Sequence, residues 1–155
     1  MRYLIQLGII SNTTSDSRKK DKPLDSIENY EKGNHELTNA EILFINEYGS
    51  PLRNLPARPV LQMTIDYFTK YELDKAIDKM INAYLKNGNI NDLEDEIDRF
   101  CQRMQSYAQA LIYDNDGRLK SNAPSTIKKK GFDHPLFITG ERLARNITCI
   151  YSKIS

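Results

Sequence analysis

The two ends of this chain alternate apolar and polar side chains, whereas its middle repeats apolar residues at helical spacing. Every second residue is apolar in two terminal runs, which are Tyr3, Ile5, Leu7 and Ile9 at one end and Ile147, Cys149 and Tyr151 at the other. A two-residue period is that of a strand with one buried face. We therefore predict a strand at each terminus, and we expect the two strands to pair antiparallel in one sheet.

The middle of the chain predicts helices. Apolar residues recur at steps of three and four through residues 60–87, which indicates a helix that is broken near Tyr71. A second stripe with this spacing comprises Leu93, Ile97, Phe100, Cys101, Met104, Ala108 and Leu111. It predicts a long amphipathic helix over about residues 92–113, begun by a capping pair of Asn91 and Glu94.

These patterns together predict an α+β fold in a single domain that spans residues 1–155. Its antiparallel sheet includes the N- and C-terminal strands and packs against the long amphipathic helix. A chain of this length buries roughly 68–70% of the surface that it exposes when unfolded. A core can therefore form without disulfides or metal ions.

Two shorter helices are predicted outside this framework. Thr38 and Glu41 have the spacing of a capping box, which predicts a helix that ends at Tyr48 with Gly49 as its left-handed cap. The prolines at 51, 56 and 59 then make a stiff connector.

In the tail, Asn122 to Ser125 predict the start of a short helix that closes at Gly131. An extended piece is expected to begin at Pro135 and Leu136. After it, Thr139 is expected to cap a turn that runs through Arg145 and leads into the last strand.

Residues 11–37 are polar and have no sustained apolar period. They contain a basic segment at residues 18–22, from Arg18 to Lys22. Loops of this length are uncommon in a compact domain and are usually functional or disordered. We interpret the segment as a mobile arm or loop that could order against a partner.

The composition argues against several classes of protein. No apolar run approaches the roughly 18 residues of a membrane span, and the first ten residues do not resemble a secretion signal, so we expect a soluble chain with no membrane partner. Cys101, Cys149, His35 and His134 lack the spacing of a zinc site. We expect two free thiols, a reducing compartment and no cofactor.

The motifs of common enzymes are missing from the sequence. The seven glycines are scattered and form no phosphate-binding loop, and there is no GxSxG elbow. His134 is interpreted as an exposed turn residue rather than a general base. Five carboxylates within residues 92–98 are interpreted as a solvated face near a helix N-terminus, rather than a calcium or magnesium site. We therefore do not expect an enzyme.

Charge is unevenly distributed along a chain whose net charge is only +1. Residues 72–98 contain eight acidic and three basic side chains, net −5, whereas residues 114–155 contain four acidic and eight basic ones, net +4. If the two segments lie on opposite flanks, copies of the chain could meet head to tail and build a ring. The alternative, left open here, is that the segments neutralise each other within one subunit.

Two parts of the chain resemble one protein family. The first half carries Ile-Asn-Glu-Tyr-Gly at 45–49 and Leu-Pro-Ala-Arg-Pro-Val-Leu at 55–61. The second half carries Ala-Pro-Ser-Thr-Ile-Lys-Lys-Lys-Gly at 123–131 and Pro-Leu-Phe-Ile-Thr-Gly-Glu-Arg-Leu at 135–143. In order and spacing these blocks resemble the virion-morphogenesis, or tail-completion, proteins of tailed bacteriophages and prophages, which are related to neck and minor tail components. The chain departs from that pattern at Val60, where Phe is usual, and at Ile138, where Asp is common.

The resemblance implies a structural protein of a phage or prophage virion, assembled in the cytoplasm of the bacterial host. Such proteins complete the tail or form the neck as a head–tail connector, in an oligomeric ring that is often a hexamer. The implied partners are further copies of the chain, the phage head connector and tail proteins. DNA would pass through the lumen without sequence-specific binding, and no cofactor is implied.

Arg58 is the preferred interface residue, because a guanidinium held between two prolines suits bidentate contact with a carboxylate of the next subunit. An internal ion pair that tethers the connector is an equally open reading. The other interface candidates are Tyr48, Pro56, Lys128, Lys129, Lys130, Phe137 and Arg142.

A nucleic-acid-binding module is the alternative function. It would use the basic segments 18–22 and 128–130, whose side chains can contact phosphates. Lysines in the last turn of a helix are also favoured by the helix dipole, and a nearly neutral chain gives this alternative less support.

Overall fold

We describe a computed structural model of the 155-residue chain. The structure describes residues 1–9, 39–136 and 142–154, without the side chains of Arg53 and Arg142. The predicted arm at 11–37, with its basic segment 18–22, lies outside the described residues, as do Thr139 and the interface candidate Phe137.

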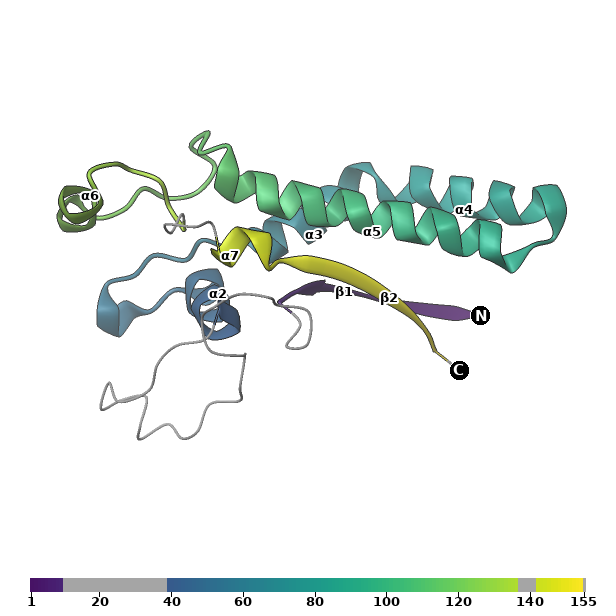
Figure 1. Cartoon of the computed structure of the whole chain (residues 1–155), viewed down its shortest axis with the longest axis horizontal. Helices are drawn as coiled ribbons and strands as arrows, with labels where there is room; N and C mark the ends of the chain where they lie inside the picture. Colours follow the sequence, from purple (N-terminus) through teal and green to yellow (C-terminus); the bar gives the residue numbers. More distant parts are fainter. Residues whose placement is uncertain (10–38, 137–141, 155) are drawn as a thin grey trace.

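The two terminal strands pair as predicted. Strand β1 spans Arg2–Gly8 and β2 spans Thr148–Ile154, and their antiparallel register places Ile5 opposite Tyr151. Over the described ranges the sheet consists of these two strands. Both termini therefore lie at the same end of the molecule (Figure 1).

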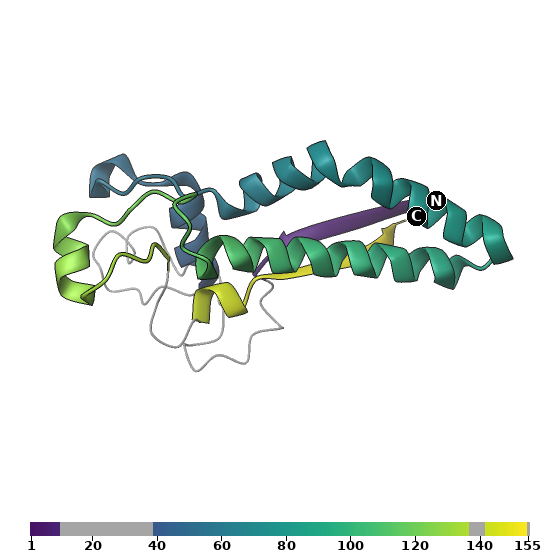
Figure 2. The ribbon, with the colours of Figure 1, turned by 90° about the horizontal axis from the view of Figure 1, so that it is seen from above.

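Helices cover one face of this sheet (Figures 1 and 2). They are α3 (Val60–Tyr71), α4 (Leu73–Asn87) and α5 (Ile90–Tyr113), and the last two form an antiparallel hairpin beside the strands. The predicted α+β fold, with terminal strands packed against a long amphipathic helix, is confirmed.

The boundaries of these helices correct one prediction. The break near Tyr71 is confirmed, because Glu72 separates α3 from α4. The predicted cap of the long helix at Asn91 is wrong, because Asn89 holds the extended conformation of a cap and its side chain accepts the Asn91 amide at 3.0 Å. Glu94 takes no part in a capping box and accepts the Tyr3 hydroxyl at 2.9 Å.

The short elements largely follow the sequence. Helix α2 spans Asn39–Tyr48 and is followed by Gly49 at φ +74°, and the 3-10 turn η1 spans Pro51–Arg53. Helix α6 (Pro124–Lys130) closes at Gly131, as predicted, and a single helical turn, α7 (Arg142–Arg145), precedes β2.

The expected extended piece at Pro135 and Leu136 is wrong. These residues form a turn in which Leu136 has φ +62°. Leu136 lies in the core beside Leu111 and Leu143, so burial of its side chain accompanies the turned backbone.

The core consists of two clusters along the molecule. One joins α2, the C-terminal half of α5 and the tail, and its most buried members are Val60, Ala108, Leu111, Ile112, Leu143 and Ile147. The other joins α3, α4 and α5 through Phe68, Ala76, Phe100 and Met104. Among the described helices, none combines the length and apolarity that crossing a bilayer requires.

Candidate interaction surface

Arg58, in the first resemblance block, bonds the loop that leads into the second block. Its guanidinium donates from Nε to the carbonyl oxygen of Lys120 at 2.7 Å and from Nη2 to that of Ser121 at 2.8 Å. The residue is 4% exposed, and burial lowers the pKa of its guanidinium, which the nearby charge of Asp133 partly offsets. Arg58 is therefore an internal tether of the connector, and it bonds two main-chain carbonyls where the sequence suggested a carboxylate.

The backbone of the same connector is fixed against α2. The Arg58 amide donates to the Asn46 carbonyl at 2.6 Å. The Glu47 carboxylate accepts the amides of Leu61 and Gln62, at 3.0 and 2.7 Å, and so satisfies free donors at the start of α3. Sequence reasoning missed this role of Glu47, because a cap supplied from 14 residues upstream leaves no local pattern.

A cavity of about 420 Å³ opens where the two blocks meet. Its lining includes the interface candidates Pro56, Arg58 and Lys130, together with Asn122 and Leu136. The Asn122 side-chain amide nitrogen is buried there, and no hydrogen-bond partner for it lies among the described residues. Described residues of both resemblance blocks thus line one cavity at this end of the fold.

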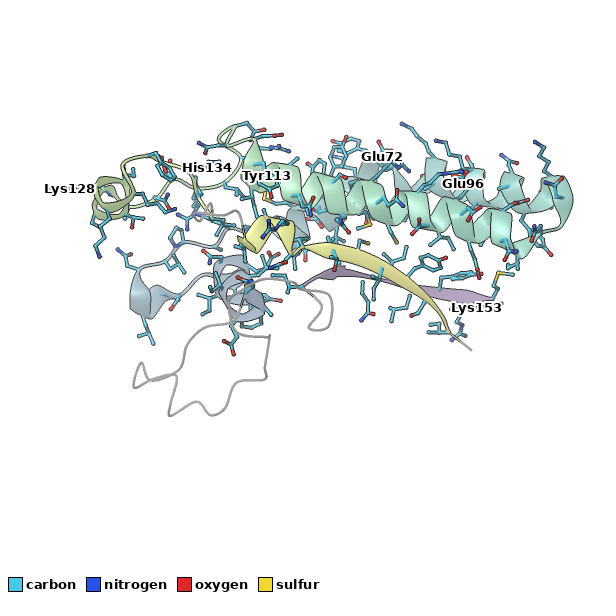
Figure 3. The ribbon with its side chains drawn as sticks, in the orientation of Figure 1. Glu72, Glu96, Tyr113, Lys128, His134 and Lys153 are labelled. Carbon is cyan, nitrogen blue, oxygen red and sulfur yellow. The ribbon has the colours of Figure 1, made fainter. Side chains whose placement is uncertain are left out.

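The three lysines of α6 differ in their surroundings. Lys128 and Lys129 are exposed at one tip of the molecule (Figure 3). Lys130 turns inward, where its Nζ donates to the His134 carbonyl at 3.2 Å. Burial, and then the charge of Arg58, lowers the pKa of Lys130. Two of the three lysines that were interface candidates are therefore exposed to solvent.

The remaining interface candidates are partly placed. Tyr48 is 71% exposed and packs against Phe44 on the outer side of α2, with ring centroids 4.9 Å apart. Arg142 lies in α7, and only its backbone is described. Phe44, which sequence reasoning missed, makes an exposed aromatic pair with Tyr48 next to the first resemblance block.

The tip of the acidic hairpin and the lysine-rich helix α6 lie at opposite ends. Glu96, in the acidic segment 72–98, lies near the tip of the α4–α5 hairpin, and Lys128 lies at the other extreme (Figure 3). Lys153, on β2, is an exception and lies at the acidic end. The ion pairs among described residues stay within one end: Glu96 pairs with Arg99, Glu72 with Arg103, and Arg118 with Asp114 and Asp116. Neutralisation between the two segments within one subunit is not seen in the described part of the chain.

The groups that sequence analysis considered for chemistry are used structurally. His134 is half-buried rather than exposed, and its ring bonds the Ile112 carbonyl. Cys101 and Cys149 are free thiols that contact each other between α5 and β2, and this contact together with burial raises the pKa of Cys149. In the described portion, no three His, Cys, Asp or Glu side chains converge as a metal site would require.

Comparison with known proteins adds nothing to this description, since no family model, curated protein or solved structure matches the chain.

Proposed function

We propose that this chain is a structural protein of a tailed phage or prophage particle, acting in tail completion or neck assembly. It would form a ring through protein–protein contacts and would catalyse no reaction. The observation that carries the proposal is the cavity of about 420 Å³ that described residues of both resemblance blocks line together, among them Pro56, Arg58 and Lys130. Segments more than 60 residues apart in sequence thereby form one surface, as a shared assembly role requires.

The distribution of charge supports the ring. A subunit with an acidic hairpin tip and a basic opposite end can contact the next subunit head to tail, and such heterologous contacts close into rings when the rotation allows it. The exposed lysines Lys128 and Lys129 on α6, and the exposed Asp95 on α5, are the side chains that would face each other.

Exposed apolar side chains also support a role in binding other polypeptides. On the described surface, large apolar residues exposed by more than a third include Phe44, Tyr48, Leu52, Ile77, Ile81 and Leu85. Several of them are neighbours on α2 or α4, and contiguous apolar surface of this kind is typical of interaction sites.

The test is to delete the gene from an inducible phage or prophage that encodes it and to examine the particles by negative-stain electron microscopy. We expect DNA-filled heads and free tails, and restoration of complete virions when the gene is supplied from a plasmid. A plasmid that carries an early stop codon is the matched control. Complete virions in normal number without the gene would refute the proposal.

A further inference from the structure

The outer edge of β1 has unpaired backbone groups. On β2, the Cys149 amide donates to Gln105 Oε1 at 3.0 Å and the Ile147 carbonyl accepts from Gln109 Nε2 at 3.1 Å, so both groups point away from β1. Leu7 lies directly opposite Cys149. Because residues of an antiparallel pair alternate between facing and avoiding the partner strand, Leu7, Ile5 and Tyr3 direct their N–H and C=O groups outward. Within residues 1–9, 39–136 and 142–154, these groups have no hydrogen-bond partner.

The helix layer is wider than the sheet beneath it. Packed helices lie about 8–10 Å apart and paired strands about 4.7–4.9 Å apart, so two helices cover roughly four strands. The described part of the chain supplies two. Seen from above, β2 runs along α5 and β1 lies between α5 and α4 (Figure 2). The uncovered position is therefore beside β1 and beneath α4.

Helix α4 presents an apolar stripe to this position. Glu72, at its start, pairs with Arg103 at 3.0 Å on the side away from the sheet (Figure 3). Ile77, Ile81 and Tyr84 follow it by five, nine and twelve residues, which at 3.6 residues per turn rotates them by about 120–180° from Glu72. They face the sheet side and remain 42%, 48% and 38% exposed.

A pocket lies at the end of the open edge. Its volume is about 330 Å³, and its apolar lining comes from the end of β1, α2 and α3, through Leu7, Ile9, Leu43, Phe44, Leu61 and Ile65. This is room for a large apolar side chain. The open edge of β1, the apolar stripe of α4 and the pocket therefore lie along one strip of the surface.

We propose that the edge of β1 binds an extended segment of a partner protein as a third strand. Its backbone would pair with Tyr3, Ile5 and Leu7, its alternate apolar side chains would pack beneath Ile77 and Ile81, and one would enter the pocket. The residues that alternate with these apolar side chains would point away from the helices into solvent and are therefore polar.

A second copy joined edge to edge is not the occupant. Each copy carries a helix layer about twice as wide as its two strands, so the two layers would collide before the strands reached pairing distance. A single strand without a helix layer of its own fits. The inference rests on the edge, stripe and pocket and does not depend on a role in virus assembly.

The test uses a synthetic peptide of about eight residues, the length that spans β1. The peptide is acetylated and amidated, and it alternates valine, isoleucine or phenylalanine with lysine or threonine. Binding is followed by fluorescence anisotropy, and amide hydrogen exchange is followed at Tyr3, Ile5 and Leu7. We expect saturable binding that slows exchange at these three amides.

Two controls distinguish strand addition from nonspecific binding of the peptide. Methylating the peptide's backbone nitrogens on the one alternate set of residues that faces β1 should abolish binding, whereas methylating the other set should not. In the protein, I81D should weaken binding roughly tenfold or more, since a charge would lie against the added strand. L52D, at a fully exposed apolar position on η1, should leave it unchanged.

Three results would overturn the proposal. One is equal loss of binding with both methylated peptides. Another is slow exchange of the three amides in the protein alone at every concentration, which would mean that the chain fills its own edge. The third is protection that rises with protein concentration, which would make a second copy the occupant. None of these results bears on whether virions need the gene.

Discussion

The Arg58 guanidinium donates to the Ser121 carbonyl across 2.8 Å, and this bond fastens the connector before α3 to the segment before α6. The two residues lie 63 positions apart, and each belongs to a stretch without regular secondary structure. Their contact therefore sets how two loops lie relative to each other at the end of the molecule where α6 is held.

Replacing Arg58 by alanine should lower the free energy of unfolding by about 2 to 4 kcal/mol, because a buried side chain is removed and two carbonyls lose a charged donor. Urea denaturation followed by circular dichroism measures this change. Arg145 is exposed, and R145A should change stability by about 0.5 kcal/mol or less. Equal effects of the two substitutions would contradict the role assigned to Arg58.

Gly49 and Gly88 form a matched pair for testing the turn after α2. Both have positive φ, +74° and +65°, but a Cβ on Gly49 would lie 2.7 Å from the Ala57 nitrogen, whereas a Cβ on Gly88 would meet open space. G88A should cost about 1 to 2 kcal/mol from backbone strain alone. G49A should cost at least about 1 kcal/mol more, from overpacking. Thermal unfolding of both variants measures the difference, and the reverse order would refute the described close approach.

Stability should fall at high pH because of Tyr3. Burial, and then its hydrogen bond to Glu94, raises the pKa of Tyr3 above its ordinary value of 10.0. A raised pKa in the folded state contributes stability that is complete below pH 10 and is lost as the pH rises through the folded-state pKa. Y3F should cost about 1 kcal/mol at pH 7 and should flatten the decline above pH 10.

Urea denaturation at pH 7 to 11 follows this dependence. Y48F is the control, because the Tyr48 ring is exposed and packs against Phe44. If Y48F and Y3F change the pH profile to the same extent, the decline does not arise from the bond between Tyr3 and Glu94.

Reversing charges should test the head-to-tail contact. In a complementation assay of the deleted phage, D95K or the pair K128E and K129E should each lower the yield of complete virions roughly tenfold. Combining the three substitutions should restore part of the yield, because the opposite signs are regained across the interface. K153E, at the acidic end, is the control that should not impair assembly.

The same lysine variants separate ring contacts from the alternative of nucleic-acid binding. Binding of duplex DNA that weakens steeply with added salt, and that K128E with K129E abolishes, would favour the alternative. Under the proposed function, the wild-type chain and these variants should bind duplex DNA equally weakly at low salt, as measured by a gel-shift assay.

Local patterns were enough to predict most of the secondary structure. Alternation at Tyr3, Ile5 and Leu7 identified β1, and the stripe from Ile97 to Leu111 identified the long helix, because the period of burial follows directly from backbone geometry. Glycines at 49 and 131 indicated helix ends, because glycine adopts the left-handed backbone conformation at little cost in free energy and other residues do not. The extended piece predicted at Pro135 and Leu136 was wrong, because these residues form a turn. Burial of Leu136 accompanies that turn, and no neighbouring residue in the sequence indicates it.

Tertiary structure alone decided what each surface residue faces. The sequence left open whether Arg58 contacts the next subunit or its own chain. Packing brings the Lys120 and Ser121 carbonyls to it from more than 60 positions away, and no local pattern could indicate them. Ile77 and Ile81 looked like core, because an apolar period does not say how much of a helix face its neighbour covers. Two strands under two helices leave that face open, and this mismatch in width is a property of the assembled layers that no segment of the sequence carries by itself.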